Sequence, residues 1–245
     1  MAIPSKKILV LDRPESEWHD FLKEFFCDTA SEVLDFSEGR SAGEAVRRTR
    51  PDIFFLRSGM VSLPLASQIK GLRSQSEGLR IFGLGIEPAR ELPYDGFCPE
   101  ATDVYGFCRQ ILGRLPFPET IDVLVADDEP EMGDLFREVT RGRKEPAFVI
   151  RQAMDGKQGL AAVRARTPAV LILDIKMPVM DGREFFRELV RLGLDVPTIV
   201  CYDAISSEEV HEIRELRKIS VIEKGTVRSS AAYLPDLVQK KVFFG

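Results

Sequence analysis

The feature that most constrains the fold is the stretch LILDIKMPVMDG, residues 171–182. It begins within the apolar run Val170–Leu173, which is typical of a buried strand, and this run ends in the carboxylate of Asp174. Two turn signals follow, Met177-Pro178 and Asp181-Gly182, and then a helical pattern begins. An acid placed directly after a hydrophobic strand lies at the carboxyl edge of a sheet, where open α/β sheets form their ligand sites.

A second apolar run, 123–126, ends in the same way, in Asp127 and Asp128. Because the carboxyl ends of parallel strands meet at one edge, we expect Asp127, Asp128 and Asp174 to share an acidic pocket. Such carboxylates repel one another, and a hard divalent cation such as Mg²⁺ would relieve the repulsion. Asp174, kept ionised, would then be a nucleophile toward a phosphoryl group and form an aspartyl phosphate. Lys224, at the end of the expected fifth strand, would pair with Asp174 or with a phosphoryl oxygen.

The whole chain alternates short apolar runs with amphipathic stretches, which indicates parallel sheets with helical crossovers. In the first half we expect strands at 7–11, 31–36, 53–56, 79–84 and 96–98, and helices at 14–27, 42–50, 63–72 and 101–112. In the second half we expect strands at 121–126, 147–151, 169–173, 198–201 and 220–223, and helices at 131–141, 156–166, 183–192, 207–217 and 230–241. The connection after Leu84 is too rich in proline for a fourth helix in the first half.

The two halves also match at residue level. AVRRTRP at 45–51 and AVRARTP at 162–168 each precede a strand, and Pro116-Phe117-Pro118 separates the halves. A repeat of this length indicates a duplicated domain and not a solenoid unit. We therefore predict a first domain at 1–117 and a second at 118–245.

Composition excludes several classes of protein. The net charge is −5 and no basic block occurs, so nucleic-acid binding has little electrostatic support. No apolar run approaches the roughly 20 residues that a membrane span requires, and the N-terminus lacks a signal-peptide pattern. The four cysteines are scattered, which favours neither a zinc site nor a disulfide framework. We therefore expect a reduced, cytoplasmic protein.

Residues 120–245 resemble the receiver domain of two-component response regulators. The motifs that carry the resemblance are VADDEP at 125–130, Asp174 with its two turns, and Lys224. The resemblance implies that Asp174 is the phosphoacceptor and Asp128 a direct Mg²⁺ ligand. It also implies that Asp127 holds the waters of the metal and that the backbone carbonyl of Lys176 completes the protein ligands. The implied fold is two flavodoxin-like, doubly wound domains, each with a five-stranded parallel sheet of order 2-1-3-4-5.

Some positions of the second half depart from the family pattern. Tyr202, or Asp203 under a one-residue shift, stands where the family carries Ser or Thr. Val221 replaces the family's aromatic switch residue, and Gly225 replaces the proline after the lysine. We therefore expect phosphorylation chemistry without the usual hydroxyl-to-aromatic relay.

The first half resembles the same fold with its site dismantled. Arg57 replaces the phosphoacceptor, Arg13 replaces a metal-binding acid, and Cys98-Pro99 takes the Lys-Pro position. Asp12 is the acid that remains, and we expect both arginines to pair with it. This half is interpreted as a pseudo-receiver for docking or dimerisation.

The resemblance implies a phosphorelay response regulator that is not an enzyme. Its donor would be a histidine kinase or a phosphotransfer protein, and it would act on a downstream protein partner or as a homodimer. With no output domain in the sequence, we expect a stand-alone adaptor or an N-terminal piece of a longer regulator.

Two alternatives remain open. Tyr202 and Val221 favour an inert scaffold. A Mg²⁺-dependent phosphatase would need an acid two residues after the nucleophile, where this chain has Lys176.

Overall fold

The computed structural model describes residues 6–13, 15–35, 42–75, 78–100, 102–203, 207–229 and 231–245. The chain forms two compact units, which we call the first domain (Pro4–Leu115) and the second domain (Pro116–Phe243). Among the helices of the described residues, none combines the length and the apolar character needed to cross a membrane.

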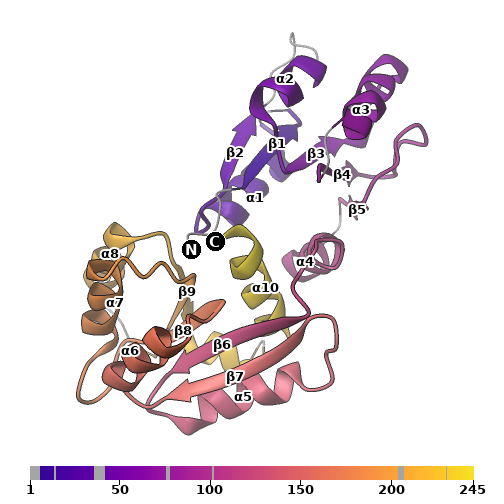
Figure 1. Cartoon of the computed structure of the whole chain (residues 1–245). Coiled ribbons are helices and arrows are strands. Elements are labelled where there is room, and N and C mark those ends of the chain that lie inside the picture. Colours follow the sequence, from indigo (N-terminus) through magenta and orange to yellow (C-terminus); the bar gives the residue numbers. More distant parts are fainter. Residues whose placement is uncertain are drawn as a thin grey trace. The chain divides into compact units, whose positions relative to one another are not determined.

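The first domain contains one five-stranded parallel sheet of order β2-β1-β3-β4-β5 (Figure 1). Its elements are β1 (Lys7–Leu11), α1 (Glu17–Phe26), β2 (Glu32–Asp35), α2 (Ala42–Thr49), β3 (Ile53–Arg57), η1 (Ser58–Met60), α3 (Leu63–Gln75), β4 (Arg80–Gly85), β5 (Gly96–Pro99) and α4 (Val104–Leu112). The strands alternate their side chains between two apolar faces. On one face Phe54 packs with Val46 of α2 and Ile69 of α3. On the other face the ring of Phe55 lies 5.8 Å from that of Phe107 of α4.

The second domain repeats this architecture with the strand order β7-β6-β8-β9-β10. Its elements are β6 (Thr120–Ala126), α5 (Pro130–Thr140), β7 (Ala147–Ala153), α6 (Gly156–Ala165), β8 (Val170–Asp174), α7 (Gly182–Arg191), β9 (Thr198–Tyr202), α8 (Ser207–Leu216), β10 (Ser220–Glu223), α9 (Lys224–Ser229), η2 (Ala231–Tyr233) and α10 (Leu234–Phe244). Figure 1 shows α6, α7 and α8 on one face of this sheet and α5 and α10 on the other. Because both faces are covered, β8 is buried along its whole length, which explains its continuous apolar run.

The predicted fold class is therefore confirmed: each domain has a parallel sheet of order 2-1-3-4-5 with helices on both faces. Residues 86–95, which are described throughout, contain no helix, as the prolines of this connection predict.

Two local predictions were wrong. Within the helix expected over 230–241, residues 231–233 form η2 and α10 begins only at Leu234, next to Pro235, which is tolerated in a first turn. Lys224 begins α9 and does not end β10. Helix α1 begins at Glu17, because Ser16 caps it by accepting a hydrogen bond from the backbone N–H of His19 at 3.1 Å.

Gly182, the first residue of α7, holds the start of this helix against the end of β8, where Asp174 lies. Its backbone N–H donates to the carbonyl oxygen of Ile175 at 2.9 Å, and a Cβ atom on Gly182 would overlap the carbonyl oxygen of Asp174. We expect Gly182→Ala to lower the free energy of unfolding of the second domain by about 2–4 kcal/mol, because backbone atoms must move to make room. Urea unfolding followed by circular dichroism measures this loss.

Gly225 of α9 supplies the control, since a Cβ there would meet the nearest atom, a carboxylate oxygen of Glu223, at an ordinary 3.8 Å. Gly225→Ala should leave stability unchanged or raise it by up to about 1 kcal/mol. Equal losses in the two variants would contradict the role given to Gly182.

Candidate functional site

The acidic side chains of the second domain meet at the carboxyl edge of its sheet. Asp174 ends β8 and Asp127 follows β6, and these strands are paired with Ala126 opposite Leu173. Asp127, Asp128 and Asp174 can each place a carboxylate oxygen within 4.8 Å of the others. Asp127 and Asp174 are buried, with 1% and 5% of their surface exposed, whereas Asp128 is exposed. The arrangement leaves one open side, toward solvent, through which a ligand can enter.

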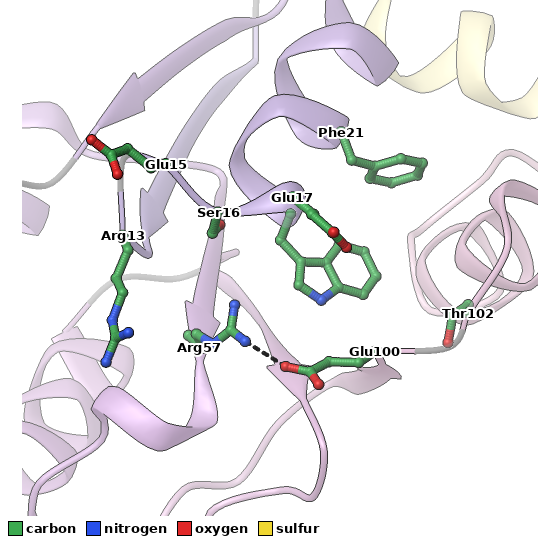
Figure 2. A pocket seen from close by; sticks show the side chains of 9 residues that line it. Arg13, Glu15, Ser16, Glu17, Phe21, Arg57, Glu100 and Thr102 are labelled. Carbon is green, nitrogen blue, oxygen red and sulfur yellow. Dashed lines mark hydrogen bonds and ion pairs between the residues drawn. The ribbon is translucent and has the colours of Figure 1, made fainter.

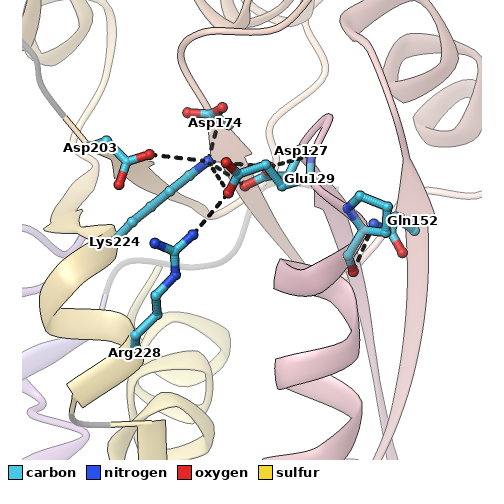
Figure 3. Close-up of polar contacts among 8 residues, drawn as sticks. Asp127, Glu129, Gln152, Asp174, Asp203, Lys224 and Arg228 are labelled. Carbon is cyan, nitrogen blue, oxygen red and sulfur yellow. Dashed lines mark hydrogen bonds and ion pairs between the residues drawn. The ribbon is translucent and has the colours of Figure 1, made fainter.

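The ammonium group of Lys224 lies between the two buried acids (Figure 3). Its Nζ is 3.0 Å from an oxygen of Asp127 and 3.1 Å from an oxygen of Asp174, although Lys224 itself is only 2% exposed. A buried ammonium is stable where carboxylates and hydrogen bonds compensate its lost hydration. The triad of Asp127, Asp174 and Lys224 is therefore one electrostatic unit.

Burial and mutual contact shift the pKa values of this triad. Burial raises the pKa of Asp127 and that of Asp174 above the ordinary 3.8, against the opposing effect of Lys224. Burial alone would lower the pKa of Lys224, but its hydrogen bond to Asp127 and the charges of both acids outweigh that effect and raise it. Lys224 is therefore charged at neutral pH.

The donor set fits a small divalent cation. Mg²⁺ prefers a few carboxylate oxygens together with waters, and the three acids supply such oxygens at one edge of a polar pocket of about 200 Å³. Lys176 also lines this pocket, beside Asp174.

Tyr202 ends β9 and lines the same pocket. Its predecessor, Cys201, pairs in register with Asp174, so Tyr202 stands one residue further along the sheet than Asp174. No small hydroxyl side chain lies at this position of β9. Val221 of β10 packs against the hydrophobic core between the sheet and α6, α7 and α8.

Two contacts of Lys224 and one of Glu129 were missed from the sequence. Its Nζ lies 3.6 Å from Glu129 and 3.9 Å from Asp203, and Arg228 donates to Glu129 at 2.9 Å. Glu129 belongs to the DDEP motif and could have been included on that ground. Arg228 was missed because its position one turn after Lys224 depends on α9, which was not expected there.

The first domain places a different set of side chains at the same sheet edge. Arg57 ends β3 and pairs in register with Leu84, which pairs with Cys98. In the second domain the corresponding line joins Asp174, Cys201 and Ile222. Arg57 thus stands at the level of Asp174, whereas Cys98 stands at the level of Ile222.

The position given to Cys98 therefore needs correction. Glu100, two residues beyond Cys98, corresponds to Lys224, which is two residues beyond Ile222. Sequence comparison alone misplaced this residue because the Cys-Pro pair imitates the Lys-Pro pattern, and only strand register shows the offset.

Arg57 and Glu100 form an ion pair (Figure 2). The positive side chain of this pair stands at the end of β3 and the negative one after β5, which is the reverse of Asp174 and Lys224 in the second domain. The guanidinium of Arg57 also lies 3.6 Å from the buried carboxylate of Asp12, as predicted. The predicted pairing of Arg13 with Asp12 was wrong for the side chain: the backbone N–H of Arg13 donates to Asp12 at 2.7 Å, but its guanidinium forms no ion pair with any described residue. Arg13, Arg57 and Glu100 border a pocket of about 780 Å³.

Arg57 should contribute more to stability through Asp12 than through Glu100. The Asp12 side chain is fully buried, whereas that of Glu100 is 41% exposed. We expect Arg57→Met to lower the free energy of unfolding by about 1–3 kcal/mol, because it leaves a buried carboxylate short of a partner. Glu100→Gln should cost less than about 1 kcal/mol. The fluorescence of Trp18, the single tryptophan, reports unfolding of the first domain in urea; equal losses would show that the contact with Asp12 carries no special weight.

Comparison with known proteins agrees with the geometry of the second domain. The family model of the response regulator receiver domain matches residues 123–230. Protein-glutamate methylesterase/protein-glutamine glutaminase 2 of Koribacter versatilis is 41% identical over 81 residues, which cover 33% of this chain and 22% of that protein. Transcriptional regulatory protein PrrA of Mycobacterium tuberculosis is 35% identical over 78 residues, covering 32% of each chain.

Among solved structures, the response regulator domain of Thermotoga maritima CheB is 21% identical, with a TM-score of 0.45, and the match covers 50% of this chain and 96% of that one. The matched segments span less than a third of the length of the two curated relatives, 22% and 32%. Residues 123–230 thus match the response regulator receiver domain family.

Proposed function

We propose that this protein is a response regulator of a two-component phosphorelay that accepts a phosphoryl group on Asp174. The donor is the phosphohistidine of a histidine kinase or of a phosphotransfer protein. The observation that supports this proposal best is the buried triad of Asp127, Asp174 and Lys224 beside the exposed Asp128, within the segment that matches the receiver family.

The residues of the pocket have distinct roles in the proposed transfer. An oxygen of Asp174 forms the new bond to phosphorus, and the bond from phosphorus to the histidine nitrogen breaks, its electron pair remaining on the imidazole. Lys224, whose Nζ lies 3.1 Å from Asp174, binds a phosphoryl oxygen as charge accumulates there. Asp127, Asp128, Asp174 and the backbone carbonyl of Lys176 would hold Mg²⁺, which supplies further charge neutralisation of the phosphoryl oxygens.

The proposed output is protein–protein interaction without the usual relay. Tyr202 stands in place of a small hydroxyl residue, and Val221 stands in place of an aromatic residue. A conformational switch that couples the movement of a Ser or Thr hydroxyl to that of an aromatic ring therefore lacks both of its side chains. We infer that a downstream protein reads the charge of the phosphorylated pocket at its surface.

We propose domain bounds of 1–117 for the first domain and 118–245 for the second. The first domain is proposed to be a receiver-like domain that does not accept phosphoryl groups. Arg57 offers no nucleophilic oxygen and is held by Asp12 and Glu100, and its guanidinium repels a divalent cation. Docking of a partner or of a second copy is the role that remains for this domain.

Intact-mass measurement tests the proposed phosphoacceptor. Incubation with acetyl phosphate and Mg²⁺ should add the mass of a single phosphoryl group to the protein. Asp174→Asn should abolish the adduct, whereas Asp134→Asn, the same change at an exposed site on α5, should retain it. Absence of an adduct on the unaltered protein, together with absence of binding of a beryllofluoride mimic, would favour the inert scaffold.

Mg²⁺ should stabilise the second domain in a pH-dependent manner. At a hundredfold excess over its Kd a ligand adds about 2.7 kcal/mol to the free energy of unfolding, and Asp128→Asn should remove most of this gain. Because the pKa values of Asp127 and Asp174 are raised, protons compete for these oxygens at higher pH than at ordinary carboxylates, so the Mg²⁺ effect should fade as the pH becomes mildly acidic.

Without Mg²⁺, the stability of the protein should change with pH in the direction opposite to that of the Mg²⁺ effect. Acids whose folded-state pKa is raised bind more protons in the folded than in the unfolded state, so stability should rise as the pH falls through that pKa. Thermal unfolding with and without Mg²⁺ measures both trends; a Mg²⁺ shift that persists unchanged in Asp128→Asn would place the ion elsewhere.

A further inference from the structure

Asp203 adds a carboxylate at the mouth of the acidic pocket. It follows directly after β9, its side chain is 57% exposed, and its Oδ2 atom lies 3.9 Å from Nζ of Lys224. Figure 3 shows Asp203 on the opposite side of the Lys224 ammonium from Asp127 and Glu129. A phosphoryl group arriving at Asp174 must come close to this ammonium and therefore to Asp203.

The pocket as a whole has an excess of negative charge. Its carboxylates are those of Asp127, Asp128, Glu129, Asp174 and Asp203. The cationic side chains that pair with them are Lys224 and Arg228, and Lys176 also lines the pocket. A divalent cation held by Asp127, Asp128 and Asp174 would offset the charge of those acids and not that of Asp203, so an approaching anion still meets a negative charge at the mouth of the pocket.

Asp203 is the exposed acid of this set with the weakest compensation. Glu129 is neutralised by Arg228 at 2.9 Å, and Asp127, Asp128 and Asp174 are the oxygen donors that a metal would bind. Among the described residues, Asp203 forms an ion pair with Lys224 alone, at a distance at the limit for a salt bridge. Its charge therefore acts mainly on whatever enters the pocket.

We propose that Asp203 is a specificity-determining residue that selects phosphodonors by charge. It disfavours small free dianions such as acyl phosphates, and it tolerates donors that carry a positive charge next to the phosphoryl group, as a phosphorylated imidazole with a protonated ring does. This inference rests on the proposed phosphoacceptor function of Asp174.

Two small donors of different charge test the inference. Acetyl phosphate is a dianion: its P–O bond to the acetyl group breaks, acetate leaves with the electron pair, and a P–O bond forms to Asp174. Phosphoramidate is a monoanion whose nitrogen is protonated: its P–N bond breaks, ammonia leaves, and the same bond to Asp174 forms. Phosphorylation rates with both donors are measured by intact mass at a Mg²⁺ concentration that saturates each variant by calorimetric titration.

Asp203→Asn should raise the rate with acetyl phosphate by roughly two- to fivefold, the size expected when one unit charge a few ångströms away is removed under near-aqueous screening. The rate with phosphoramidate should rise less, so the ratio of the two rates increases. Added salt should narrow the difference between the unaltered protein and Asp203→Asn, because it screens exposed charges. Asp203→Glu, which keeps the charge, should retain the original ratio, and Asp134→Asn on α5 should leave it unchanged.

The possible failures are distinguishable. If the unaltered protein is phosphorylated and Asp203→Asn leaves the ratio of the two rates unchanged, the role of Asp203 is wrong and the proposed function stands. If the rates with both donors change by the same factor, Asp203 acts on pocket structure and not on donor charge, which also overturns the inference. If neither donor phosphorylates any variant, the proposed function itself fails.

Discussion

The contact of Lys224 with Asp127 and Asp174 is the interaction on which the candidate site depends. An ammonium that is 2% exposed is stable because two carboxylates lie 3.0 and 3.1 Å away. The same contact keeps the two acids from repelling each other at the end of neighbouring strands. It couples β6, β8 and α9, elements far apart in sequence, and it leaves Asp128 at the open side, where a ligand enters.

The first domain satisfies the same constraint with charges of opposite sign. Arg57 replaces the acid of β3, and Glu100 occupies the level of the lysine, so an ion pair still bridges the strand ends. The buried carboxylate of Asp12 also contacts the guanidinium of Arg57. The first domain therefore keeps an ion pair across its sheet edge, although Arg57 offers no nucleophilic oxygen.

The second domain combines three carboxylates and a lysine at its sheet edge with a tyrosine at the end of β9. Tyr202 ends β9 and Asp203 follows it, both lining the pocket, and Val221 packs against the core. The proposed chemistry and the proposed readout rest on different positions, since the acids and Lys224 stand at or just beyond the ends of β6, β8 and β10, whereas Tyr202 belongs to β9 and Val221 to the edge strand β10. A chain can therefore preserve the first while the second diverges.

The sequence by itself determined the fold class and the meeting of Asp127, Asp128 and Asp174, because continuous apolar runs specify buried parallel strands and parallel strands end at one edge. The strand order followed from the resemblance of its motifs to the receiver domain. It could not determine that Glu100, and not Cys98, stands opposite Arg57, since register depends on strand pairing across the sheet. It also missed the contact of Lys224 with Asp203, the ion pair of Arg228 with Glu129, and the short helix α9. Such contacts join segments distant along the chain, and only the packing of those segments brings their charges within reach of one another.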